Sequence, residues 1–262
     1  MSDGIVEADV SRYARHREGV YQTIQQIPLW IVVLVLLAGI VIVSVMRSEN
    51  YSDIVGFISK GISFTVRISV LGYALALVVG LIVGLGRISR NPIVHTLATL
   101  YVEILRGVPI LVVILYVAFV VSPHMGVRSN IVRAIVALGL AYAAYLAEIY
   151  RAGIEAVPKG QIEAAYSLGM TRYQTMRYIV LPQAIRLILP PLGNDFIAIL
   201  KDSSLATVLS VPELTQQTRL YVSRTFDTFG GWTMAALLYL SMTLVLSLFV
   251  RVLERISHYE RR

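Results

Sequence analysis

Residues 163–182 read EAAYSLGMTRYQTMRYIVLP and form a polar segment between two long apolar stretches. The first three residues favour a helix, Gly169 permits a turn that other residues resist, and Arg172 can restart a helix that Pro182 ends. We expect two short helices at an angle, with a small-residue surface that suits docking into a groove of a partner. A glycine-broken amphipathic loop between membrane helices is the simpler alternative, and the local pattern leaves both open.

The composition of the chain indicates a membrane protein. Of its 262 residues, 56% are hydrophobic and 15% are charged, whereas about 25% charged residues is typical of soluble domains. A soluble globule of this size cannot bury so much apolar surface, which excludes a disordered protein, a soluble enzyme and a nucleic-acid binder. The chain contains no cysteine, so it has neither a disulfide framework nor a thiolate site.

Six stretches are long and apolar enough to be membrane helices, which need about 20 residues each. One contains Gly107 and Pro109, and because the piece after Pro109 is too short to cross alone, we join its halves into one kinked span. Another contains Pro190 and Pro191, which should break it early and free backbone carbonyls. The predicted spans are residues 27–46, 62–86, 93–121, 131–150, 185–210 and 232–250.

The distribution of basic residues predicts the orientation of these spans. With six spans both termini lie on one side, and that side carries 14 of the 23 Lys and Arg residues against 7 on the other side. Lys and Arg gather on the cytoplasmic side of membrane helices. We therefore expect both termini and residues 151–184 in the cytoplasm, and the net charge of +7 reflects this topology rather than an acidic partner.

The polar segment resembles the cytoplasmic coupling loop of permease subunits of ATP-binding-cassette importers. Its pattern is Glu-Ala-Ala, three residues, Gly, nine residues, Ile, any residue, Leu-Pro. Residues 87–92, 101–109 and 200–205 are similar to the polar amino acid branch of that family, although Val108 stands where members commonly have Thr. The positions that match the coupling pattern, which the resemblance implies dock on the ATPase, are Glu163, Ala164, Ala165, Gly169, Ile179, Leu181 and Pro182.

The resemblance covers the chain from about residue 61 to its end and implies an all-α integral membrane fold, that of a type I ATP-binding-cassette importer permease. Residues 61–262 would be the five-span core, with a coupling loop at about 152–184. Residues 1–26 would be a cytoplasmic segment, and residues 27–60 an extra N-terminal span with an external loop.

The resemblance also implies the partners of the chain. Two permease copies or paralogues would surround a central path in a prokaryotic plasma membrane, with two ATPase subunits beneath and an extracytoplasmic amino acid-binding protein delivering substrate. The sequence lacks a Gly-x-x-x-x-Gly-Lys-Ser/Thr phosphate loop, so ATP and Mg²⁺ would bind the partner and the chain itself would be neither an enzyme nor a cofactor carrier. Its four histidines are too scattered to suggest a metal site.

Polar residues within the spans are candidates for the substrate path, because charged groups at membrane depth are costly unless paired or hydrated. Two neighbouring i, i+7 stripes in the fifth span could offer both charge signs to a zwitterionic amino acid. Each charged group could instead belong to a structural ion pair, and Glu103 with Arg106 at i, i+3 is the clearest such case. The candidates are Glu103, Arg106, Tyr142, Tyr145, Glu148, Asn194, Asp195, Lys201, Asp202, Ser203 and Ser204.

The charged candidates sum to −2, which leans towards a cationic amino acid. Substrate choice also depends on the binding protein, so glutamine, glutamate, histidine, arginine, lysine and cystine all stay open.

Two other classes of protein compete with the importer. A secondary transporter or channel predicts an internal repeat, which we do not find between the two halves. An intramembrane enzyme predicts a motif such as His-Glu-x-x-His or Gly-x-Ser-x-Gly, which is absent.

Overall fold

The computed structural model of the chain describes residues 39, 43 and 51–259, and the described residues from Ser52 onward form one compact unit. The predicted span 27–46 lies outside the described residues except for Gly39 and Val43. The elements are α3 (Tyr51–Ile58), η1 (Ser59–Gly61), α4 (Ile62–Arg87), α5 (Pro92–Gly107), α6 (Ile110–Tyr116), η2 (Val117–Val121), α7 (Ser122–His124), α8 (Asn130–Glu155), α9 (Lys159–Ser167), α10 (Arg172–Thr175), η3 (Met176–Val180), α11 (Leu181–Asp202), η4 (Ser203–Leu209), α12 (Leu214–Thr225) and α13 (Thr228–Tyr259).

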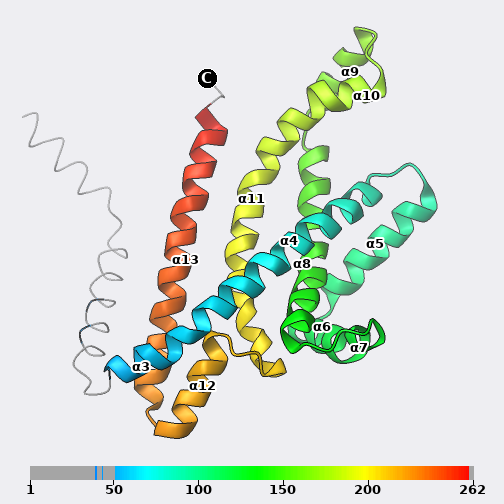
Figure 1. Cartoon of the computed structure of the whole chain (residues 1–262). Coiled ribbons are helices and arrows are strands. Elements are labelled where there is room, and N and C mark those ends of the chain that lie inside the picture. Colours follow the sequence, from blue (N-terminus) through cyan, green and yellow to red (C-terminus); the bar gives the residue numbers. More distant parts are fainter. Residues whose placement is uncertain (1–38, 40–42, 44–50, 260–262) are drawn as a thin grey trace, which may run out of the picture. The chain divides into compact units, whose positions relative to one another are not determined.

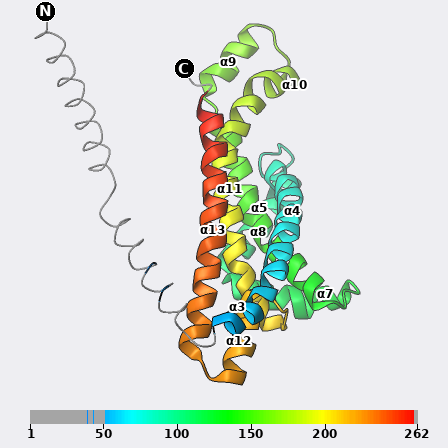
Figure 2. The ribbon, with the colours of Figure 1, turned by 60° about the vertical axis from the view of Figure 1, so that its left-hand side comes forward.

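All regular secondary structure in the described part of the chain is helical, as the sequence predicts (Figure 1). In Figures 1 and 2, α8, α11 and α13 run along the same direction, with α9 and α10 at one end and α12 at the other. Within this part, three helical segments are long and apolar enough to cross a membrane, and they match the predicted spans 62–86, 131–150 and 232–250. The count of six spans stays a prediction.

Helices α4 and α8 pack closely against each other at two glycines of α4. A β-carbon at Gly80 would lie 2.8 Å from Cβ of Leu146, and one at Gly84 would lie 2.9 Å from the carbonyl oxygen of Ala147. Small residues four apart therefore let the two backbones approach closely, as is common between membrane helices.

The predicted span 93–121 is bent far more sharply than a proline kink, and its crossing as one broken span stays a prediction. Helix α5 and the helical segment Ile110–His124 are bent by 112° relative to each other, so they do not continue one helix across the break. The reason lies in two consecutive extended residues, Val108 at ψ 138° and Pro109 at ψ 133°. The residue before a proline avoids the helical region, and here the proline itself is extended as well, so the chain turns a corner where one proline would give a kink.

Helix α11 does not break at Pro190 and Pro191, contrary to the sequence expectation. It runs without interruption from Leu181 to Asp202, with both prolines inside it. Two missing N–H groups weaken the helix locally without ending it. The predicted span 185–210 extends beyond this helix, and residues 203–209 form the tighter turns of η4.

The polar segment 163–182 begins with the predicted pair of short helices. Helix α9 ends before Gly169, whose φ of +78° is the left-handed conformation that glycine adopts without strain. Helix α10 then begins at a capping box formed by Thr171 and Gln174. Pro182 does not end this second helix, because it lies in the first turn of α11, directly after the π-helical turn η3, where a missing N–H is tolerated.

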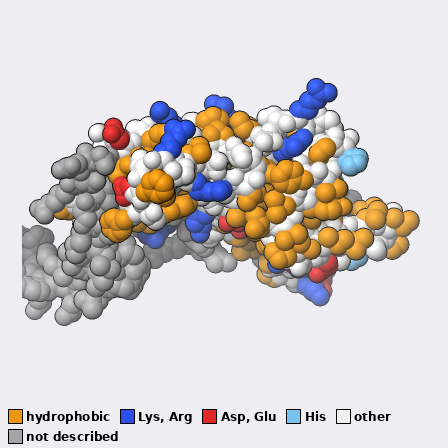
Figure 3. Space-filling view, turned by 90° about the horizontal axis from the view of Figure 1, so that it is seen from below, with side chains coloured by type: hydrophobic (Ala, Val, Ile, Leu, Met, Phe, Trp, Pro, Cys, Tyr) orange, Lys and Arg blue, Asp and Glu red, His pale blue; other side chains and the backbone are white. Residues whose placement is uncertain are grey.

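A buried carboxylate lies at the start of α12, at the end of the unit opposite α9 and α10. Glu213 is fully buried, and its side chain accepts hydrogen bonds of 2.7 Å from the backbone N–H groups of Thr215 and Gln216 and one of 3.0 Å from the Tyr239 hydroxyl. Burial raises the pKa of Glu213 to about 7. Seen from this end, basic side chains are scattered among large hydrophobic patches (Figure 3).

Candidate functional site

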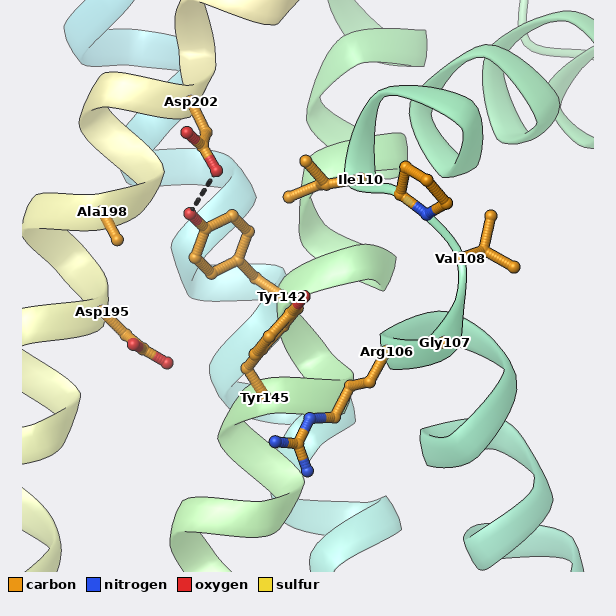
Figure 4. A pocket seen from close by; sticks show the side chains of 10 residues that line it. Arg106, Gly107, Val108, Ile110, Tyr142, Tyr145, Asp195, Ala198 and Asp202 are labelled. Carbon is orange, nitrogen blue, oxygen red and sulfur yellow. Dashed lines mark hydrogen bonds between the residues drawn. The ribbon is translucent and has the colours of Figure 1, made fainter.

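A cavity of about 380 Å³ lies where the α5–α6 corner, α8 and α11 meet (Figure 4). Five of its lining side chains were predicted from the sequence as path residues. The residues that line it are Arg106, Gly107, Val108, Pro109, Ile110, Tyr142, Tyr145, Asp195, Ala198 and Asp202.

Helix α8 supplies two tyrosines to the cavity, at i and i+3. The buried Tyr142 donates a hydrogen bond of 2.8 Å to Oδ2 of Asp202 on α11. Its ring lies 5.8 Å from that of Tyr145 at an interplanar angle of 42°. Because the two residues follow each other on one helix face, they present a continuous polar-aromatic wall.

Helix α11 supplies two carboxylates, and the predicted i, i+7 stripe of Asp195 and Asp202 does face one site. Ala198 lies between them on the same face and also lines the cavity. One side-chain oxygen of Asp195, Oδ2, is buried and has no hydrogen-bond partner among the residues that the structure describes. A buried carboxylate oxygen without a donor is costly, so this atom is a candidate to meet a ligand.

Arg106 enters the cavity from the end of α5, with its guanidinium 5.5 Å from the ring centre of Tyr145. The predicted ion pair of Arg106 with Glu103 is not formed in the described part of the chain. Glu103 has a side chain that is 69% exposed, and one oxygen lies 4.0 Å from Arg87. The i, i+3 spacing allows a pair, but Arg106 points into the cavity, which Glu103 does not line.

Glu148 lies outside the cavity lining, in an ion-pair network near the end of α8 that leads to α9. Its two oxygens are shared between Arg87 of α4 and Arg151, and Arg151 also pairs with Glu155. Glu148 therefore links α4 to α8, which favours the structural alternative for this residue over substrate contact.

The remaining predicted path residues also lie outside the lining. Asn194 and Lys201 form the second stripe of α11 and are exposed on the surface of the unit, away from the face of Asp195. The Ser203 hydroxyl is buried and donates to the Leu200 carbonyl at 2.7 Å, and Ser204 is partly buried.

Sequence reasoning missed two parts of the cavity wall. The corner from Gly107 to Ile110 was predicted to be a kink within a span. Pro109 was the sequence feature that could have indicated a turn there instead. Ala198 carries no chemistry of its own, but its position three residues after Asp195 and four before Asp202 places it on their face.

The residues of the coupling pattern lie on or near the α9–α10 hairpin. Glu163 and Ala164 are exposed, whereas Ala165 is buried beneath them. Leu168 and Tyr173, beside the turn at Gly169, are 82% and 76% exposed. Ile179 is partly buried in η3, and Leu181 and Pro182 are exposed at the start of α11. The hairpin thus exposes large apolar side chains, and its docking on a partner stays a prediction.

Comparison with known proteins identifies the family. The sequence pattern of the family described as "Binding-protein-dependent transport system inner membrane component" matches residues 76–256. This match covers more than half of the chain and includes the cavity and the hairpin.

Individual relatives agree with this match. The chain is 40% identical over 205 residues to the "Probable amino-acid ABC transporter permease protein YckA" of Bacillus subtilis, covering 78% of this chain and 90% of that protein. It is 39% identical over 198 residues to the "Glutamine transport system permease protein GlnP" of Escherichia coli, covering 75% and 90%. A solved structure, "Crystal structure of an amino acid ABC transporter with histidines", has a TM-score of 0.72 and 36% identity, covering 79% of this chain and 95% of that one. The chain therefore belongs to the binding-protein-dependent transport system inner membrane components, the permeases of ATP-binding-cassette importers.

Proposed function

We propose that this chain is the permease subunit of an ATP-driven importer for polar amino acids, and that the cavity between α5, α8 and α11 is part of its translocation path. The observation that carries the proposal is the presence of a guanidinium and two carboxylates around one cavity in a bundle of apolar helices. Charged groups at membrane depth are costly, so they are kept where they meet a substrate, water or one another. The named relatives act on amino acids, which supports the same class of substrate here.

The cavity complements a zwitterion. Arg106 offers donors to an α-carboxylate, and Asp202 offers acceptors to an α-ammonium group. These two groups come from α5 and α11, and Tyr142 of α8 donates to Asp202, so the position of a bound amino acid depends on how α5, α8 and α11 are placed relative to one another.

The hairpin of α9 and α10 would connect this cavity to ATP hydrolysis on a separate subunit. It follows directly from the end of α8 and leads into α11, and both of these helices line the cavity. An ATPase that moved the hairpin would therefore move two walls of the path. In this arrangement the hairpin faces the cytoplasm, ATP and Mg²⁺ bind the ATPase, and a dimer of permeases receives substrate from an extracytoplasmic binding protein.

Reconstitution tests this proposal. The chain, co-purified with its cognate ATPase in proteoliposomes and supplied with its binding protein, should take up a radiolabelled polar amino acid only with ATP. Gly169→Leu should leave ATP hydrolysis measurable but reduce the number of amino acid molecules transported per ATP hydrolysed. The reason is that a bulky side chain is strained at φ +78° and should distort the hairpin. Gly126→Leu, at φ +75° with nothing within 4 Å of the new β-carbon and outside the hairpin, is the matched control. Uptake by the chain alone, driven by an ion gradient without any ATPase, would refute the proposal.

A further inference from the structure

A second hollow, the lateral groove, lies where α4, α11 and α13 meet and has a volume of about 600 Å³. Ten of its twelve lining residues are hydrophobic, and the other two are Ser69 and Ser241. Each serine hydroxyl donates a hydrogen bond of 2.7 Å to a carbonyl of its own helix, at Thr65 and Leu237 respectively. The lining side chains therefore leave no hydroxyl donor unpaired, and the lateral groove suits an apolar occupant.

The lateral groove has the length of one leaflet of a bilayer. On α13 it extends from Leu238 to Phe249, which is roughly 16 Å along a helix. The hydrocarbon core of a bilayer is about 30 Å thick, so each leaflet spans about 15 Å. Two of the lining side chains, Val245 and Phe249, are 69% and 61% exposed, so the groove is open along its side. An acyl chain can therefore enter it from the surrounding lipid and lie along α13.

A basic side chain lies beside this apolar surface, near the start of α4. The guanidinium of Arg67 is 5.8 Å from the ring centre of Phe64, one helical turn closer to that start. It borders a neighbouring hollow of about 670 Å³, which shares two lining residues with the lateral groove, so the two spaces adjoin. This neighbouring hollow is lined by Ser63, Val66, Arg67, Val70 and Leu71, of which Val66 and Val70 are shared.

The positive charge of Arg67 is not compensated by a carboxylate. Among the residues that the structure describes, no acidic side chain forms an ion pair with it. Lys60, seven positions earlier on the same face, also has no such pair, and its Nζ lies 5.8 Å from the ring centre of Phe57. Charged groups in an apolar span are costly unless they are paired, hydrated or extended towards the interface. The start of α4 therefore favours an anionic group beside the lateral groove.

We infer that an anionic phospholipid binds here, with its phosphate at Ser63 and Arg67 and one acyl chain in the lateral groove. The guanidinium and the hydroxyl donate to the phosphate oxygens, and Lys60 adds attraction from the same helix face. A second copy of the chain could cover the apolar surface, but it would also have to bring an acidic group to Arg67. A phospholipid carries both parts in one molecule. The lipid site shares no lining residue with the cavity of the proposed path, so it does not depend on the transported substrate.

The test compares phosphatidylglycerol with phosphatidylcholine, two phospholipids that differ in net charge and are used with identical acyl chains. The purified permease–ATPase complex is incubated with equal amounts of both, and the lipids that stay bound are counted by native mass spectrometry. We expect at least about fivefold more bound phosphatidylglycerol, the effect of one basic residue on an anionic lipid. Arg67→Gln should reduce this preference about fivefold, and Arg67→Lys should retain most of it. Arg128→Gln is the matched control, because Arg128 is exposed but borders neither hollow.

A second pair of variants tests the place of the acyl chain. Val66→Trp puts a bulky ring where the two hollows adjoin and should cause a loss of bound phosphatidylglycerol, whereas Val78→Trp, at a 61% exposed position of α4 outside both hollows, should not. Equal binding of the two lipids by the unmodified complex would overturn the inference, whether or not the variants fold. An unchanged preference in folded Arg67→Gln, or unchanged binding in folded Val66→Trp, would also overturn it. A disulfide between two Val245→Cys copies in membranes would show that a second copy covers the lateral groove, and it would reject the lipid.

Discussion

At the scale of single residues, the hydrogen bond from Tyr142 to Asp202 joins two walls of the cavity. It joins α8 to α11 through a buried hydroxyl, at 2.8 Å. It also orients the carboxylate that we assign to the α-ammonium group of the substrate. Its loss should therefore affect transport more than stability.

Tyr142→Phe removes that hydroxyl and leaves the ring in place. We expect the KM for amino acid uptake to rise about tenfold and the free energy of unfolding to fall by about 1 kcal/mol. Tyr101→Phe is the control, because the Tyr101 hydroxyl also donates at 2.7 Å, to the Leu140 carbonyl, but outside the cavity. It should lose similar stability without a change in KM. Equal KM shifts in uptake assays of the two variants would contradict a specific role for Tyr142.

Glu213 makes stability depend on pH. Its pKa is raised from 4.5 to about 7, so its carboxyl group favours the folded state most while protonated. This contribution is fully present below pH 4.5 and is lost as the pH rises to about 7, by up to about 3 kcal/mol. Glu213→Gln should flatten the dependence of Tm on pH across this window, measured on the full chain in detergent. A Tm of the unmodified chain that rises with pH between these values would contradict the assignment.

At the scale of elements, the contact between α4 and α8 leaves no room for added volume at its glycines. Gly80→Ala places a methyl group against Leu146 and the Ala143 carbonyl, 3.0 Å away. We expect a loss of about 1–3 kcal/mol in the free energy of unfolding, the usual cost of overpacking. Gly56→Ala on α3, where nothing lies within 4 Å of the new atom, should be neutral or slightly stabilising. Thermal unfolding in detergent checks the difference between the two variants.

Residue spacing predicted much of the fold and part of the cavity. Runs of apolar residues located α4, α8 and α13, and the i, i+7 spacing placed Asp195 and Asp202 on one face. Spacing failed where the outcome depended on contacts between helices. The sequence allows Glu103 to pair with Arg106, but Arg87 of another helix lies near Glu103 instead. Proline was equally ambiguous, since its effect depends on the backbone around it: Pro109 turns the chain, whereas Pro190 lies within a continuous helix.

At the scale of the whole molecule, the hairpin and the α12–α13 turn lie at opposite ends of the bundle (Figure 1). The proposed topology places the hairpin in the cytoplasm and the turn outside. The sequence has no cysteine, so a single introduced thiol reports one position without background. Leu168 and Phe226, which are 82% and 85% exposed, are suitable positions at the two ends.

A membrane-impermeant maleimide added to intact cells should label Phe226→Cys and spare Leu168→Cys. In the complex, Leu168→Cys should crosslink to the ATPase with a yield that changes with nucleotide, because the hairpin is the proposed docking element. Phe226→Cys is the control and should give no such crosslink. Labelling of Leu168→Cys from outside would reverse the proposed orientation, and nucleotide-independent crosslinks would count against coupling through the hairpin.

The corner between α5 and α6 has a consequence for solvent. The carbonyl oxygens of Gly107 and Val108 accept no backbone hydrogen bond in the described part of the chain, and both residues line the cavity. Irregular backbone at membrane depth is tolerated only where it is buried in protein or borders water. Water in the cavity would satisfy these carbonyl oxygens, because both residues line it. In the proposed path, an amino acid that enters such a hydrated cavity exchanges one polar shell for another, so the energetic barrier to import would lie mainly in moving the walls.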